Sequence, residues 1–135
     1  MPVELEIVSP EKLLLSRPVE MVVLPAYEGE MGVLQGHSPM IVLLRGGMIR
    51  LYEGGVVKEE LYVSGGFAEV TPERVTVLAT EAAPSAEVSR AEGERRLAAA
   101  EADYAAADKM DIVTLDAAMD RIQSARAMLE AAHAA

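Results

Sequence analysis

Proline and glycine are confined almost entirely to the first part of this chain. All seven prolines and nine of the ten glycines lie at or before Pro84, whereas the 50 residues from Ala86 to Ala135 contain 17 alanines and a single glycine. Proline and glycine interrupt helices and favour turns, while alanine is the strongest helix former. A change from β structure to helix near residue 84 is therefore predicted, with one domain over residues 1–84 and a second over residues 85–135.

The first 84 residues contain short runs that are rich in β-branched residues and often alternate between apolar and polar. Turn pairs such as Gly46-Gly47, Gly54-Gly55 and Thr71-Pro72 separate them at the spacing typical of an all-β fold. The runs are VELEIV, KLLLS, VEMVVL, MIVLL, MIRLY, VVKEELYVS, FAEV and RVTVLAT. This pattern predicts an N-terminal antiparallel β-sandwich. The segment YEGEMGVLQGHSP, Tyr27 to Pro39, is expected to be a glycine-rich loop.

The remaining residues predict a two-helix antiparallel hairpin. The interruption DKMDIVT separates two helical segments, with Ser85 suited to cap the first helix and Asp111 or Thr114 the second. Alanine removes less apolar surface from water than leucine, so docking should be weak although helicity is high. We therefore expect that the hairpin can leave its resting place and stay helical. The apolar seams expected from helical spacing are Ala91, Ala98, Ala102 and Ala105, then Leu115, Ala118, Met119, Ile122, Ala125, Leu129 and Ala132.

Charge and composition exclude several classes of protein. The net charge of −10 and pI near 4.6 argue against nucleic-acid binding, which needs clustered Lys and Arg. No cysteine is present, so neither disulfides nor thiolate metal sites can form. No apolar run approaches the roughly 18 residues needed to span a bilayer, and the start MPVELEIVSP lacks the pattern of a signal peptide. Membrane association is expected only through partners.

No catalytic constellation emerges from the sequence. His37 and His133 have no partner at the spacing of metal ligands, and no serine stands in a G-x-S-x-G context. The spacing of Gly29, Gly32 and Gly36 does not match a phosphate-binding loop. Five arginines on the helices leave two interpretations open, a charged surface or an anion site formed by arginines from both helices. These are Arg90, Arg95, Arg96, Arg121 and Arg126.

Several motifs together resemble one family. The block EGEMGVLQGHSP from Glu28 to Pro39, the segment LYVSGG from Leu61 to Gly66, and the Ala-rich hairpin resemble the epsilon subunit of bacterial F-type ATP synthase. The resemblance covers nearly the whole chain in order. It implies a non-catalytic rotor subunit of the central stalk, which couples rotation of the c ring to ATP synthesis.

The resemblance also implies partners and contact residues. The sandwich is expected to bind the gamma subunit and to sit on the c ring, and so to couple rotation to ATP synthesis by the alpha and beta subunits. Glu30 and His37 correspond to c-ring contact positions, and Ser9 and Lys12 to part of the gamma-facing edge. The expected location is the cytoplasmic face of the bacterial inner membrane, held there only through the complex.

In this family the hairpin has two arrangements, one folded on the sandwich and one extended that opposes ATP hydrolysis. Glu87, Arg90 and Arg121 match candidate ATP-binding positions, but Glu87 replaces an aspartate of the family motif and Ala117 stands where strong binders carry a second arginine. Weak ATP binding at best is predicted, with no other cofactor. Residues 114–135 offer only Arg121 and Arg126 as basic groups, so weak inhibition of hydrolysis is also predicted.

A different class of function remains open at this level. The sandwich could hold a small apolar ligand in a free-standing protein, with the hairpin as a lid. An enzyme is less supported, because no nucleophile, metal set or acid–base pair was found. Binding to the gamma subunit distinguishes the first two hypotheses.

Overall fold

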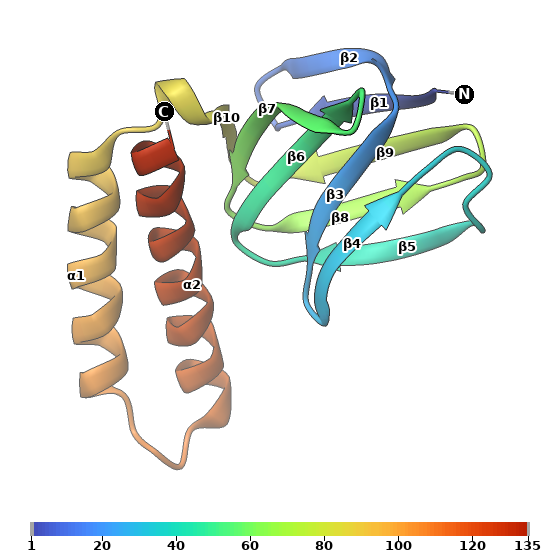
Figure 1. Cartoon of the computed structure of the whole chain (residues 1–135). Coiled ribbons are helices and arrows are strands. Elements are labelled where there is room, and N and C mark those ends of the chain that lie inside the picture. The colour runs from blue at the N-terminus through green and yellow to red at the C-terminus, as the bar shows by residue number, and fades with distance from the viewer. Residues whose placement is uncertain (1, 135) are drawn as a thin grey trace.

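The computed structural model describes residues 2–134, which form ten strands followed by two helices (Figure 1). The strands are β1 (Val3–Val8), β2 (Leu13–Val19), β3 (Met21–Ala26), β4 (Gly29–Val33), β5 (Met40–Leu44), β6 (Gly47–Glu53), β7 (Val56–Val63), β8 (Gly66–Val70), β9 (Arg74–Ala79) and β10 (Ala82–Pro84). A short 3-10 turn, η1 (Ser85–Glu87), leads to α1 (Arg90–Ala106) and α2 (Ile112–Ala134). The predicted order of sandwich and helical hairpin is confirmed.

The strands form two layers. Their hydrogen-bonded order is β10-β7-β6-β3-β5-β8-β9-β1-β2, with β4 on the free side of β3. One layer contains β3, β4, β6, β7 and β10, and the other contains β5, β8, β9, β1 and β2 (Figure 1). The layers are linked where β3 meets β5 at the single pair Ala26 and Leu44. Inward-facing side chains such as Leu5, Leu51 and Val77 are fully buried between them, as the alternation of the strands requires.

Two strands and one pairing differ from the sequence-based expectation. Residues Gly29–Val33, expected to lie in a loop, form β4 against β3. Their glycines obscured the alternation, because only Val33 of this strand is fully buried. Strand β10 also went unpredicted, since it has three residues and ends at Pro84. The pair β1–β9 is parallel, whereas the neighbouring pairs β1–β2 and β8–β9 are antiparallel.

Side-chain caps fix where each helix begins. Ser89 caps α1, because its side chain accepts a hydrogen bond from the Glu92 amide at 3.1 Å. The expected cap, Ser85, is wrong, since it lies in the 3-10 turn four residues earlier. Asp111 fulfils its predicted role before α2, accepting from the Thr114 amide at 3.2 Å and from the Thr114 hydroxyl.

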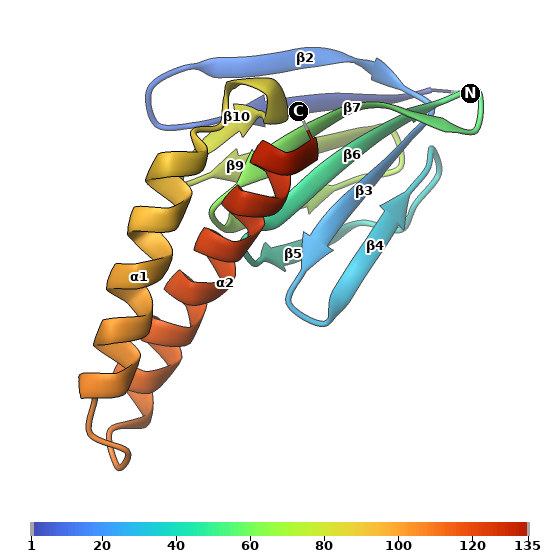
Figure 2. The ribbon, with the colours of Figure 1, turned by 60° about the vertical axis from the view of Figure 1, so that its left-hand side comes forward.

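The hairpin docks on the sandwich through α2. This helix lies along β6 and β7, α1 packs on α2, and the loop joining the helices points away from the strands (Figure 2). A small apolar cluster holds α2 in place: Met48, Tyr62, Ala127, Met128 and Ala131, with Val88 beside them. Neither helix has both the length and the apolarity needed to cross a membrane.

The interface between the two helices corrects the expected seam of α1. Ala91, Ala98, Ala102 and Ala105 are exposed, whereas Gly93 and Ala100 are buried. A side chain at Gly93 would place its Cβ 3.1 Å from Leu129, so the missing side chain lets the helices approach closely. In a helix with alanine on every side, apolar periodicity carries little information about which face is buried.

Candidate interaction surfaces and hairpin groove

Apolar side chains cross the outer face of the second layer in one line. Pairing registers place Leu43 opposite Phe67, Phe67 opposite Leu78, Leu78 opposite Val8, and Val8 opposite Leu13. Leu43 is 64% exposed, Leu13 54% and Phe67 41%. We call this line of five side chains the outer apolar row. Contiguous exposed apolar surface of this kind is typical of sites that contact a protein partner, a membrane or a ligand.

The turn between β1 and β2 continues the outer apolar row. It joins Val8 to Leu13 and contains both residues predicted to face the gamma subunit. The Ser9 amide donates to the Lys12 carbonyl at 3.0 Å, and the Ser9 hydroxyl approaches the same oxygen at 3.3 Å. Ser9 and Lys12 therefore form one polar end of an otherwise apolar surface.

Glu30 lies on β4 close to the tip of the β3–β4 hairpin and forms an ion pair with Arg50 of β6. Arg50 also contacts Glu60 of β7 at 3.3 Å and Glu130 of α2 at 3.7 Å. Burial lowers the pKa of Arg50, but the charges of Glu30 and Glu60 outweigh it, so the pKa is raised. One guanidinium thus joins three elements through their carboxylates.

His37 lies beyond the opposite end of β4, so the structure does not bring it together with Glu30. Its Nδ1 is 2.8 Å from the carbonyl oxygen of Ser38. The preceding Gly36 has a φ of +88°, which favours glycine, and its amide donates to the Pro72 carbonyl at 2.7 Å. This loop is therefore held against the β8–β9 turn.

The three residues predicted to bind ATP are dispersed. Glu87 ends the 3-10 turn, and Arg90, the first residue of α1, pairs with Glu94 at 3.2 Å. Arg121 of α2 pairs with Asp103 at 3.6 Å. Arg90 and Asp103 are thirteen residues apart on one helix, or about 20 Å along its axis. These residues do not form one site in this arrangement of the hairpin.

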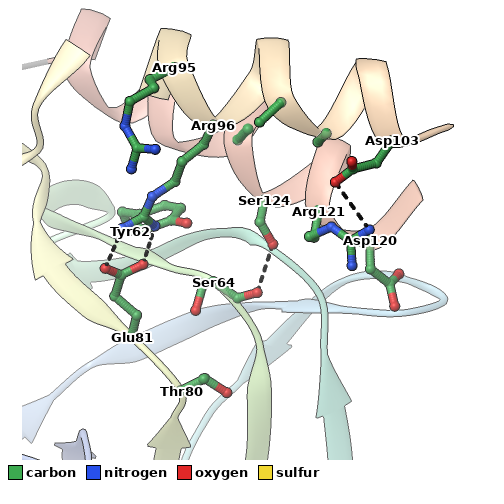
Figure 3. A pocket seen from close by; sticks show the side chains of 13 residues that line it. Tyr62, Ser64, Thr80, Glu81, Arg95, Arg96, Asp103, Asp120, Arg121 and Ser124 are labelled. Carbon is green, nitrogen blue, oxygen red and sulfur yellow. Dashed lines mark hydrogen bonds and ion pairs between the residues drawn. The ribbon is translucent and has the colours of Figure 1, made fainter. Parts of the chain in front are cut away.

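A groove of about 570 Å³ instead lies between the hairpin and the sandwich (Figure 3). Arginines from both helices line this groove, which is the arrangement that an anion site formed by both helices would need. They are Arg95, Arg96 and Arg121. Facing them are Glu81 from the β9–β10 turn, Asp103 and Asp120, so the lining carries both signs of charge.

Ion pairs neutralise Arg95 and Arg96, the two arginines that α1 contributes to the groove. Arg96 donates through both terminal nitrogens to Glu81 and through Nε to Glu92 at 2.8 Å. Arg95 pairs with the same Glu92 within α1. Hydrogen bonds from Arg95 and Arg96 lower the pKa of Glu92 to about 2. The hydrogen bonds from Arg96 to Glu81 and Glu92 in turn raise the pKa of that arginine.

Tyr62 forms the floor of the groove. Its side chain is 1% exposed, and within residues 2–134 its hydroxyl has no hydrogen-bond partner. Burial, and then the charge of Glu81, raise the pKa of Tyr62 to about 12, despite the opposing influence of Arg96. The phenol is therefore neutral at physiological pH.

Sequence reasoning missed Glu81, Tyr62 and Ser124 as residues of this region. Tyr62 and Ser64 lie in the LYVSGG segment, whose sequence resembles the family but predicts no role for either residue. Ser124 is a polar residue between apolar positions of α2 and could have been singled out on that ground. Within the described residues, no group of three or more His, Asp or Glu side chains is placed to hold a metal ion.

Comparison with known proteins gives consistent similarities. The family model described as ATP synthase, Delta/Epsilon chain, beta-sandwich domain, matches residues 2–85. The ATP synthase epsilon chain of Granulibacter bethesdensis is 70% identical over 128 residues, covering 95% of both chains. That of Gluconacetobacter diazotrophicus is 46% identical over 132 residues, which is 98% of this chain and 94% of that protein.

Solved structures show the same architecture. A chain of the Euglena gracilis mitochondrial ATP synthase structure, which contains OSCP, F1 and the c ring, has a TM-score of 0.76 at 28% identity. The match covers 98% of this chain and 81% of that one. A chain of the Tetrahymena thermophila mitochondrial ATP synthase central stalk and c ring has the same fold, with a TM-score of 0.63 at 15% identity over 97% and 96%.

Proposed function

The chain belongs to the family of ATP synthase epsilon chains, non-catalytic subunits of the central stalk, and from this premise we propose how it makes its contacts there. The observation that carries the proposal is the outer apolar row, an exposed apolar surface that the β1–β2 turn extends. We propose that this surface binds the gamma subunit, and that the β3–β4–β5 region faces the c ring.

The row is suited to a long-lasting protein contact. Its side chains project from adjacent strands of one layer, so they are held rigidly before a partner arrives. Burying large apolar side chains such as Phe67 and Leu43 supplies affinity, while Ser9 and Lys12 at the end of the row contribute orientation.

Binding to purified gamma subunit tests this assignment. Phe67→Asp and Leu43→Asp should each weaken binding by about tenfold or more, because a charge would be buried at the centre of the contact. Val56→Asp is the matched control, since Val56 is 54% exposed but lies on β7 in the other layer. Equal affinity of Phe67→Asp and the control would exclude the row as the gamma surface.

For the c ring we propose Glu30, which lies in β4 near the tip of the β3–β4 hairpin, and His37, which lies beyond the opposite end of that strand. The two residues are seven positions apart, at most about 24 Å of chain, so a partner touching both must extend along the strand. Single cysteines at positions 30 and 37 should each cross-link to the c subunit in the assembled complex. Cross-linking from only one position would assign the contact to that end of β4 alone.

For nucleotide binding the prediction remains weak affinity. Glu87, Arg90 and Arg121 lie apart, and the groove arginines Arg95 and Arg96 are already paired with carboxylates. A nucleotide would have to displace these partners. Calorimetry with ATP should give no saturation in the micromolar range, and tight binding would contradict the prediction.

Inhibition of ATP hydrolysis by the hairpin is also predicted to be weak. The second helix opposes Arg121 and Arg126 with Asp116, Asp120 and Glu130, so it offers little positive charge to an acidic partner. The ATPase activity of the assembled complex with and without residues 85–135 measures the effect. A large activation on removal would overturn the prediction.

The alternative of a free-standing ligand-binding protein is set aside by the full-length match to epsilon chains. The space between the two layers is also filled by buried aliphatic side chains such as Leu24 and Ile49. We propose that the subunit resides at the cytoplasmic face of the bacterial inner membrane, attached through its partners in the complex.

A further inference from the structure

The turn that connects β7 to β8 lies where both helices reach the sandwich. It consists of Ser64 and Gly65 and leads into Gly66, the first residue of β8 and the end of the LYVSGG segment. Gly65 and Gly66 have φ values of +142° and +131°, and a Cβ at Gly66 would lie 2.2 Å from the Leu78 carbonyl oxygen. The turn therefore has a fixed backbone that only glycine allows at this point.

Helix α2 is attached to this turn directly. The Ser124 hydroxyl donates to the Ser64 carbonyl at 2.7 Å (Figure 3). Helix α2 also lies close to the neighbouring β5–β6 turn, because a Cβ at Gly46 would lie 2.4 Å from the Ser124 Cα. Ser124 is thus held between two turns of the sandwich.

Helix α1 is attached to the same turn through Glu81. The Ser64 amide donates to the Glu81 carbonyl at 3.0 Å, and the Thr80 amide donates to the Gly65 carbonyl at 3.1 Å. These bonds fix the backbone on both sides of the Glu81 carboxylate. That carboxylate accepts from both terminal nitrogens of Arg96, as Figure 3 shows.

We propose that Ser64, Glu81, Arg96 and Ser124 form a hairpin anchor, which holds both helices on the sandwich and makes release of the hairpin sensitive to ionic strength. The proposal concerns this chain alone and does not depend on the contacts proposed for the gamma subunit or the c ring. The anchor gives the LYVSGG segment a role: it presents a hydrogen-bond acceptor to α2 and positions an acidic side chain for α1.

The anchor is important because the apolar cluster between α2 and the sandwich is small. Of the α2 side chains in the cluster that contacts β6 and β7, two are alanines and one is Met128. Alanine contributes little apolar area, so a few polar contacts decide whether the hairpin stays docked. The Arg96 and Glu81 side chains are 36% and 43% exposed, and a pair exposed to this degree is screened by salt.

Hydrogen exchange of the full-length chain tests the proposal, with amides of α1 and α2 compared with those of β1, β8 and β9. At low salt, Arg96→Gln and Glu81→Gln should each speed exchange in the hairpin by about two- to fivefold and leave the strands unchanged. Arg95→Gln is the matched control, because it removes the same charge from the same helix but breaks only the pair with Glu92.

Ionic strength and charge reversal supply two further readouts. Raising the salt concentration from about 0.01 M to about 1 M shortens the screening length from about 30 Å to about 3 Å. It should speed hairpin exchange in the wild-type chain and have a smaller effect in Arg96→Gln, where, within residues 2–134, only the Arg50–Glu130 pair still joins a helix to the sandwich through opposite charges. The double variant Glu81→Arg with Arg96→Glu should restore slow exchange relative to either single variant, because it rebuilds the pair.

Three results would overturn the anchor. The first is equal acceleration by Arg96→Gln and Arg95→Gln, and the second is equal acceleration in the strands and the hairpin. The third is a hairpin whose exchange does not respond to salt in the wild-type chain. Because the measurement needs no partner subunit, it can fail while gamma binding through the outer apolar row holds, and the reverse is also true.

Discussion

At the scale of single residues, Tyr62 combines a well-packed ring with an unpaired hydroxyl. The ring belongs to the cluster that docks α2, so its removal would leave a cavity under the hairpin. The hydroxyl gains no hydrogen bond within the described residues and has lost its contact with water. Ring and hydroxyl therefore have opposite effects on stability.

Tyr62→Phe is expected to raise the free energy of unfolding by about 1 kcal/mol, because it keeps the ring and removes a buried donor without a partner. Denaturant unfolding measures the change, with Tyr52→Phe as control, because Tyr52 is a more exposed tyrosine on the neighbouring strand β6. A clear loss of stability would show that the hydroxyl is bonded in solution.

The same residue makes the wild-type chain sensitive to alkali. The pKa of Tyr62 is raised from 10.0 to about 12, so folding favours its neutral form. The stability that the neutral phenol contributes to the fold is fully present below pH 10 and is lost as the pH rises from 10 to 12. Tyr62→Phe should remove that part of the alkaline destabilisation.

At the scale of elements, each helix is stabilised near its start by one carboxylate. These carboxylates are Glu92 in the first turn of α1 and Asp111 just before α2. Arg95 and Arg96 hold the pKa of Glu92 at about 2, against 4.5 for an unperturbed glutamate. Hydrogen bonds from Thr114 likewise lower the pKa of Asp111, the cap of α2. A carboxylate whose pKa is lowered by folding stabilises the folded state at pH values above its unfolded pKa. This stabilisation is lost as the pH falls and the carboxylate becomes protonated.

We therefore expect the hairpin to loosen before the sandwich as the pH falls from about 5 towards about 2. Exchange rates of hairpin amides over this range provide the measurement. Glu92→Gln should be looser at neutral pH and respond less to acid, since the titrating group is gone. An unchanged acid profile in Glu92→Gln would contradict the assigned cause.

Elements also show what the sequence could and could not predict. Residues Val3–Val8 and Met40–Leu44 were found at their observed limits, because their alternating or β-branched patterns match one-sided burial. Strand β4 was missed because its pairing comes from β3 and not from its own glycine-rich composition. The buried face of α1 was missed because it depends on Gly93 fitting against Leu129, which no helical periodicity reveals.

The contact surfaces also include features that local sequence predicts and features that depend on how distant strands pair. Ser9 and Lys12 could be placed on one turn from the chain alone, since four residues close that turn. The outer apolar row could not, because it is assembled by cross-strand registers such as Phe67 with Leu78. The pairing of Glu81 with Arg96 likewise joins the sandwich to the hairpin, and no local pattern specifies how these two parts are placed.

At the scale of the whole molecule, the sandwich core is independent of the hairpin. Among the residues that the structure describes, the main buried cluster contains strand residues from Val3 to Ala79 and none from α1 or α2. A chain ending at Pro84 is therefore expected to fold cooperatively and to bind the gamma subunit with little loss of affinity. Circular dichroism and gamma binding check this, and an unfolded fragment would show that the hairpin supports the core.

The two outward faces of the sandwich carry different contacts. The hairpin covers Met48 and Tyr62 on one layer, while the outer apolar row crosses the other. Mutations that tighten or loosen the hairpin can therefore accumulate without touching the surface that would transmit torque. Related chains could differ widely in regulation and still fit the same rotor.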